Sequence, residues 1–110
     1  MPTSNKVTLT GKVIDIEKVI MAPFEEKDHV CRFNLFTEDQ VHIPVVCTAR
    51  LAAFVSSLAM KGYDTGREGW CTLYIEGRLR QTGRGMAVIA DGMCFVDKFN
   101  NPIGNLEKNE

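Results

Sequence analysis

The sequence lacks long apolar runs and any excess of charge of one sign. Its 110 residues carry 13 basic and 14 acidic side chains, a net charge of −1. This balance excludes a globally basic nucleic-acid binder but not a local basic patch. The longest apolar runs are a handful of residues, far short of a membrane span, and no signal-peptide pattern is present. We therefore expect one cytoplasmic domain with no membrane contact.

The sequence also lacks the short motifs of common active sites. It contains no G-x-S-x-G, no H-E-x-x-H and no P-loop. Its two histidines, His29 and His42, lie in no triad pattern, and the carboxylates are scattered. The Gly83-Arg84-Gly85 run is not followed by a helix, so it is read as a turn and not a phosphate cradle. We expect no enzyme and no cofactor.

Paired cysteines are missing as well. Each of the four cysteines stands alone within an apolar stretch, and no C-x-x-C pair occurs. Four such separated positions would have to converge on one point to hold zinc, so no metal site is expected. The thiols are predicted to be buried and reduced, acting as small apolar side chains. The positions are Cys31, Cys47, Cys71 and Cys94.

What the sequence does have is five β-like stretches and one helix-like stretch. Strands are predicted over residues 6–20, 29–37, 41–47, 70–80 and 86–96, and a helix over Ala49–Met60. The first strand changes its apolar phase near Gly11, which predicts a bulge or bend. Pro44 has no amide proton, so the third strand lies partly at an edge or carries a bulge. Residues 81–85 are predicted to be a glycine-containing hairpin loop.

The helix and the fourth strand each have a definite apolar face. Thr48 is the predicted N-cap of the helix, and Gly62 is its stop. The predicted helix stripe is Leu51, Phe54, Val55 and Leu58, and the predicted inward face of the fourth strand is Cys71, Leu73, Ile75, Gly77 and Leu79. Three strands, a short helix and a hairpin predict an all-β protein, a five-stranded OB-fold barrel with one short helix between strands three and four. Residues 1–98 form this domain, and residues 99–110 are expected to be a C-terminal tail.

Four segments in the same order resemble the bacterial single-stranded DNA-binding protein family. They are residues 5–11 (NKVTLTG), 33–37 (FNLFT), 45–52 (VVCTARLA) and 74–80 (YIEGRLR). The resemblance covers about residues 5–96. It implies an OB barrel that binds single-stranded DNA and assembles as a dimer or tetramer.

Departures from the family pattern point to an accessory relative. Positions where the family stacks bases on aromatic rings hold His42 and Thr48 here, and a third falls near Arg84. The hairpin after residue 77 is shorter than in the family, and the chain has no long tail with an acidic tip. These features are similar to the tailless primosomal replication protein N (PriB-like) type, for which replication or helicase-loading proteins are possible partners.

The candidate binding residues combine cations with rings, as single-strand binding requires. They are Lys12, Arg32, Asn34, Phe36, His42, Trp70, Tyr74, Arg78, Arg80 and Arg84. Between residues 77 and 90 there are three arginines and no acid, a local basic ribbon. With few rings available, binding should rely on arginine and weaken steeply with salt.

Each candidate has an alternative role. Outward arginines on a strand are commonly just a solvated face, and Arg84 could solvate a turn as well as clamp a phosphate. Phe36 could be a base platform or an oligomer contact, and Trp70 and Tyr74 fit a subunit interface equally well. His42 could be a half-buried polar group.

Two functions follow. The first is a largely sequence-independent single-stranded DNA-binding protein of replication, recombination or replication restart, with RNA as a possible ligand. The second is a protein-interaction OB module with weak or no nucleic-acid binding. The arginine ribbon favours the first, and the missing rings at His42 and Thr48 favour the second.

Overall fold

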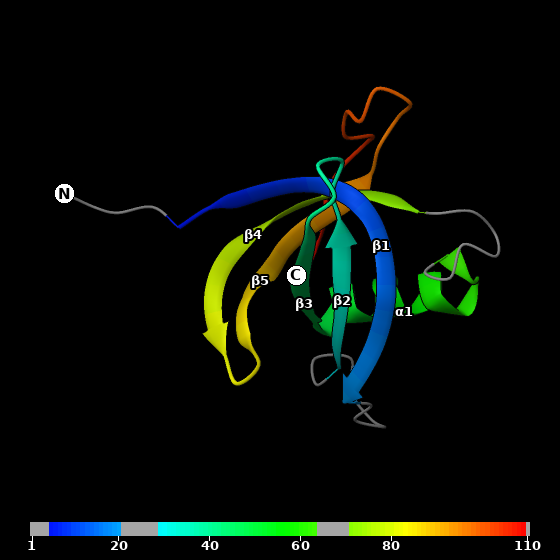
Figure 1. The fold of residues 1–110 in the computed structure, drawn as a ribbon. Coiled ribbons are helices and arrows are strands. Elements are labelled where there is room, and N and C mark those ends of the chain that lie inside the picture. The colour runs from blue at the N-terminus through cyan, green and yellow to red at the C-terminus, as the bar shows by residue number, and fades with distance from the viewer. Residues whose placement is uncertain (1–4, 21–28, 64–70, 110) are drawn as a thin grey trace.

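The predicted order of strands and helix is confirmed in the computed structural model, which describes residues 5–20, 29–63 and 71–109. The elements are β1 (Val7–Ile20), β2 (Val30–Phe36), β3 (His42–Thr48), α1 (Ala49–Met60), β4 (Thr72–Thr82), β5 (Gly85–Phe95) and a short β6 (Glu107–Lys108). The first five strands form the predicted ring with α1 between β3 and β4 (Figure 1). β6 is an addition that the sequence pattern did not predict. Within the described ranges no helix is long and apolar enough to cross a membrane.

The sheet closes into a barrel because β3 and β5, the ends of the five-strand row, also pair with each other. The strand order is β3-β2-β1-β4-β5-β6, and every neighbouring pair is antiparallel. The pairing of β3 with β5 is parallel, with Val45 opposite Val88 and Val46 opposite Ile89. This pairing begins just after Pro44, so the proline lies where β3 has no neighbour on that side. Ring closure removes most of the unpaired strand edges that invite aggregation.

β1 belongs to both halves of the barrel, and Figure 1 shows it curving over the other strands. Its first part pairs with β4 and its second part with β2, and Lys12 has a partner on each side. A Cβ on Gly11 would lie 2.7 Å from the Phe36 carbonyl oxygen, so the close approach of β1 and β2 requires glycine here. The predicted bulge is present but lies further along, between Ile14 and Glu17, where Asp15 has a φ of 54°.

The core is built from the inward faces of the strands and one stripe of α1. The fully buried large side chains include Val13, Phe33, Leu35, Val45, Leu51, Val55, Leu58, Leu73, Ile75, Val88 and Met93. Two predicted core members differ. Phe54 is only half-buried and packs edge-on against Phe95, with ring centroids 5.6 Å apart. Leu79 is 44% exposed because it lies beyond the barrel wall.

The four cysteines are buried and none of them forms a disulfide, as predicted. Cys31 and Cys47 are register partners across β2 and β3. Burial raises the pKa of the Cys71 thiol to about 11, and burial together with the nearby Cys31 raises the pKa of Cys47 further. Both groups therefore remain neutral thiols at neutral pH.

The cap of α1 comes from the far end of the chain and not from Thr48. Thr48 occupies the N-cap position, but its side chain makes no capping bond to the helix. Instead, the Leu51 amide donates to Asn109 Oδ1 at 2.9 Å, and Asn109 Nδ2 donates to Thr48 Oγ1 at 3.2 Å. The stop is as predicted: Gly62 has a φ of 80° and its amide donates to the Ala59 carbonyl.

The hairpin of β4 and β5 is longer, and its loop shorter, than the sequence pattern indicated. The predicted hairpin loop is present but is shorter than 81–85. β4 continues to Thr82, β5 begins at Gly85, and only Gly83 and Arg84 lie between them. β1 pairs with β4 up to Gly77, and β3 meets β5 from Val88 onward. Residues 78–87 therefore project as a two-stranded ribbon, here called the arm (Figure 1).

The base of the arm and the C-terminal segment are both tied to the barrel. The Asn5 side chain forms a pair of hydrogen bonds with the backbone of Leu79, at 2.8 and 3.0 Å. At the other end of the chain, β6 pairs with Gly92 and Met93 of β5, and Glu107 forms an ion pair with Arg50 of α1 at 3.0 Å.

Candidate nucleic-acid interface

The outward face of β1, β2 and β3 brings together five of the predicted binding residues. The strand register arranges this face in three rows. Lys12, Phe36 and His42 form one end row; Ile14, Asn34 and Pro44 form the middle row; Glu17, Arg32 and Val46 form the other end row. These residues point outward because their neighbours Val13, Cys31, Phe33, Leu35, Val45 and Cys47 face the core. We call this surface the β1–β3 face.

The aromatic end of the β1–β3 face combines a ring with a cation. Phe36 is half-buried and packs edge-on against His42, with ring centroids 4.8 Å apart and planes at 78°. Lys12 is exposed on the neighbouring strand. Beside them lies a groove of about 370 Å³, lined by Thr10, Gly11, Lys12, Phe36, Thr37, Glu38, Gln40, Thr72 and Asn100. The ring, the hydroxyl and amide groups and the Lys12 ammonium suit a nucleotide's base and phosphate, whereas the Glu38 carboxylate in the same lining repels a phosphate.

The opposite end of the face borders the tip of the arm. A smaller hollow of about 220 Å³ is lined by Val30, Arg32 and Val46 of the face and by Thr82, Gly83 and Arg84 of the arm. Asn34, in the middle row, makes only a long contact with Asp15, with Nδ2 donating to Oδ2 at 3.5 Å. Asn34 therefore keeps most of its hydrogen-bonding capacity for another partner.

The three arginines of the arm do not form the acid-free ribbon that the local sequence suggested. Arg78 donates from Nε and Nη2 to the two Asp91 oxygens, each at 3.2 Å. Arg84 donates from Nη1 to both oxygens of Glu17, at 3.0 and 3.2 Å. Within the described part of the chain, Arg80 has neither an ion pair nor a side-chain hydrogen bond and is exposed. Arg80 is therefore the arm cation most ready to meet a phosphate.

Tyr74 lies apart from the β1–β3 face. Its register partner is Thr10, so β1 separates it from β2 and Phe36. The Tyr74 hydroxyl donates to Glu76 Oε2 at 2.8 Å, and this hydrogen bond, with smaller contributions from desolvation and nearby charge, raises the tyrosine pKa. A carboxylate held beside the ring disfavours a phosphate there. Trp70 lies outside the described residues.

The carboxylates that pair with the arm arginines were not predicted from the sequence. Glu17 and Asp91 neutralise two of the three arginines, and neither falls within residues 77–90. The two-residue loop seen in the structure sets a hairpin register that places Asp91 diagonally across from Arg78, whereas the predicted loop at 81–85 gives a different register. Glu17 is 67 positions from Arg84 and has no local signal.

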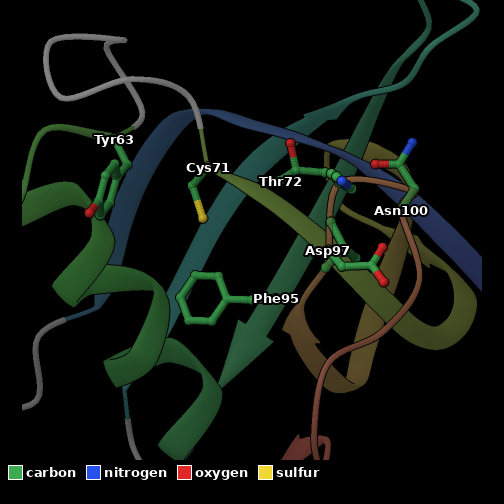
Figure 2. Close-up of a pocket in the computed structure, with 8 residues that line it drawn as sticks. Tyr63, Cys71, Thr72, Phe95, Asp97 and Asn100 are labelled. Atoms are coloured by element: carbon green, nitrogen blue, oxygen red, sulfur yellow. The ribbon is translucent and has the colours of Figure 1, made fainter.

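A larger hollow lies at the end of the barrel. It measures about 490 Å³ and is lined by Tyr63, Cys71, Thr72, Phe95, Val96, Asp97, Lys98 and Asn100. In Figure 2 the Cys71 thiol points into the space between the Tyr63 and Phe95 rings. This thiol has a raised pKa, and the Asp97 carboxylate is occupied by the Phe99 and Asn101 amides at 2.8 and 3.0 Å. Among the residues with a described placement, no group of three metal-ligating side chains comes together.

Solved structures resemble this fold, whereas no protein-family model and no curated protein matches the sequence. The N-terminal domain of PriB protein from Thermoanaerobacter tencongensis, described as dimeric, is 26% identical with a TM-score of 0.59 over 86% of this chain and 98% of that one. The second single-stranded DNA-binding protein of Mycobacterium smegmatis is 15% identical with a TM-score of 0.63, covering 96% and 100%. A small single-stranded DNA-binding protein from Mycoplasma pneumoniae is 16% identical with a TM-score of 0.55, covering 96% and 98%.

These likenesses span almost the whole barrel and agree with the segment motifs. The two single-stranded DNA-binding proteins share the fold, and the PriB domain shares sequence with this chain as well. The five-stranded OB fold predicted from the strand order is confirmed, and so is the predicted resemblance to the single-stranded DNA-binding and PriB-like family.

Proposed function

We propose that this protein binds single-stranded DNA, largely without sequence preference, along its β1–β3 face. The observation that carries the proposal is the row of Lys12, Phe36 and His42 beside a groove of about 370 Å³. A base stacks on Phe36 while Lys12 takes a neighbouring phosphate. Asn34 and Arg32 continue the path along β2, and Arg80 and Arg84 flank it from the arm.

The expected contributions of stacking and of phosphate contacts predict binding that depends strongly on salt. A stacked base contributes roughly 1–3 kcal/mol, and the described face offers few rings. Cations must supply the remainder, and each phosphate contact on a single strand adds about 0.7 to the slope of log affinity against log salt. No base-edge reader is needed for this mode, because every base has a face that can stack.

The experiment is fluorescence anisotropy with labelled oligo-dT, an RNA oligonucleotide and a duplex of equal length, each at low and moderate salt. We expect single-strand binding that weakens with salt, and weaker duplex binding because paired bases cannot reach Phe36. Equal affinity for duplex and single strand would overturn the proposal. The RNA arm decides whether the 2′-hydroxyl matters.

The cellular role we propose is in DNA replication, recombination or replication restart. The likeness to the PriB domain supports this role, and its description as dimeric supports assembly of this chain into a dimer or tetramer. Replication or helicase-loading proteins are the proposed partners. Light scattering during gel filtration tests the assembly, and a monomer at micromolar concentration would contradict it.

A second candidate function is a protein-interaction module without nucleic-acid binding. The observation that favours it is that Arg78 and Arg84 already have carboxylate partners. The same anisotropy titration separates the two functions. If no oligonucleotide binds even at low salt, the β1–β3 face is a protein-contact surface.

A further inference from the structure

The tip of the arm lies against the end of the β1–β3 face that should carry DNA. Thr82, Gly83 and Arg84 share a hollow with Arg32 and the apolar side chains of Val30 and Val46. A strand that passes from Phe36 toward Arg32 would therefore meet the arm tip. Such a strand would have to enter the hollow of about 220 Å³ between the arm tip and the face.

One ion pair holds the arm tip to the face. Arg84 Nη1 contacts both Glu17 oxygens, at 3.0 and 3.2 Å. Glu17 is also the register partner of Arg32 on the neighbouring strand. A carboxylate therefore stands beside two arginines at the position where a phosphate of a bound strand would be neutralised.

We propose that Glu17 acts as an internal phosphate mimic that latches the arm over the β1–β3 face until a DNA phosphate displaces it from Arg84. This inference rests on the proposed function and concerns regulation of that same site. It makes Glu17 a positioning residue for Arg84. Arg84 can then bind a phosphate only when its ion pair with Glu17 is broken, which we call the open state.

The geometry suits a latch that opens readily. The two side chains are 60% and 52% exposed, so water screens their attraction. Arg84 is flanked by Gly83 and Gly85, and a Cβ at either glycine would meet nothing within 4 Å. The backbone on both sides of the arginine thus has room to change conformation without disturbing packing.

The latch also changes the salt dependence of binding. When a phosphate takes Arg84 from Glu17, the DNA releases a counterion and the freed carboxylate recruits one. The exchange therefore adds almost nothing to the salt slope. Without the carboxylate, the Arg84 contact should add about 0.7 to the slope for a single strand.

The test is a double-mutant cycle of Glu17→Gln, Arg84→Ala and both together, with oligo-dT anisotropy as the readout. We expect Glu17→Gln to raise affinity about two- to fivefold, the range of exposed ion pairs, and to steepen the salt slope. In the Arg84→Ala background the same substitution should raise affinity less, because the latch is already absent and only the effect of Glu17 on DNA and Arg32 remains. Glu107→Gln is the matched control, because it removes one acid from a comparably exposed ion pair with Arg50 outside the face, and it should leave affinity unchanged.

The outcomes are distinct. An equal gain from Glu17→Gln with and without Arg84 overturns the latch, because the carboxylate would then only repel DNA. No gain while the wild-type protein binds also overturns it and leaves the proposed function standing. Binding by Glu17→Gln alone supports a tightly closed latch. Binding by neither protein overturns both proposals.

Discussion

Phe36 is the residue on which base contact at the proposed face depends. It is the last residue of β2, with Lys12 on one side and His42 on the other. Its outward direction follows from the alternation of β2, where Cys31, Phe33 and Leu35 face inward. An apolar ring left half-exposed among polar neighbours has a surface to offer a ligand.

Replacing Phe36 with Ala should weaken oligo-dT binding by roughly five- to 150-fold, the equivalent of about 1–3 kcal/mol of lost stacking. Phe36→Tyr should retain most of the affinity because it keeps a ring. Anisotropy at fixed salt measures both variants. Phe95→Ala is the control, since Phe95 packs on Phe54 of α1 and not on the β1–β3 face. Equal losses for Phe36→Ala and Phe95→Ala would indicate that the fold has been disturbed.

Among the elements, the arm shows why charge must be assigned in three dimensions. Arg78 and Arg80 are alternate neighbours on β4, yet only Arg78 has a carboxylate within reach among the described residues. A cation that already has a partner gains less from a phosphate than one that does not.

Arg80→Gln should therefore lower oligo-dT affinity more than Arg78→Gln does. It should also reduce the slope of log affinity against log salt by about 0.7, whereas Arg78→Gln should change the slope less. Titrations of the two variants at several salt concentrations provide the comparison. Equal slope changes would mean that Asp91 does not neutralise Arg78 in solution.

The helix depends on a residue from the end of the described chain. Asn109 accepts from the Leu51 amide, which has no acceptor within the first helical turn. Asn109→Ala should destabilise the protein by about 1 kcal/mol, the usual cost of losing an N-cap. That loss corresponds to a melting temperature about 4–8 °C lower for a domain near this size. Asn105→Ala in the same segment is the control for thermal unfolding, because Asn105 is exposed and should tolerate the change.

At this scale the sequence predicted what is local and missed what is distant. Apolar alternation identified most of the strands, and helical spacing between Thr48 and Gly62 identified α1. Leu79 continues the alternation of β4 past Gly77, and nothing in that pattern marks where the strand leaves the barrel. Thr48 has the right chemistry for a cap, but Asn109 occupies that role through a contact that only the fold creates. The partners of Arg84 and Thr48 are both far away in the chain.

For the molecule as a whole, the buried thiols link stability to alkaline pH. Burial raises the pKa of Cys71 from 9.0 to about 11. Between these values the unfolded chain has lost the thiol proton and the folded chain has kept it, so the unfolded state binds fewer protons and stability falls as pH rises. The raised pKa values of Cys47 and Tyr74 act in the same direction.

Thermal unfolding should therefore show a lower melting temperature at pH 10 than at pH 8. A Cys71→Ala variant should show a smaller drop over the same interval, although it is less stable throughout. If the wild type were as stable at pH 10 as at pH 8, the thiols would not be buried as described.

The barrel is closed by the strand pairing that has the fewest residue pairs. β3 and β5 meet through two register pairs, whereas β4 and β5 are paired along most of their length. Local opening begins where few hydrogen bonds must break. Among the barrel ladders, amide exchange should therefore be fastest for those amides of Val45, Val46, Val88 and Ile89 that face across the β3–β5 pairing. Each opening bares the edges of β3 and β5, to which a strand of another chain could add. The β3–β5 pairing that completes the barrel is thus also the place where domain swapping or aggregation is expected to begin.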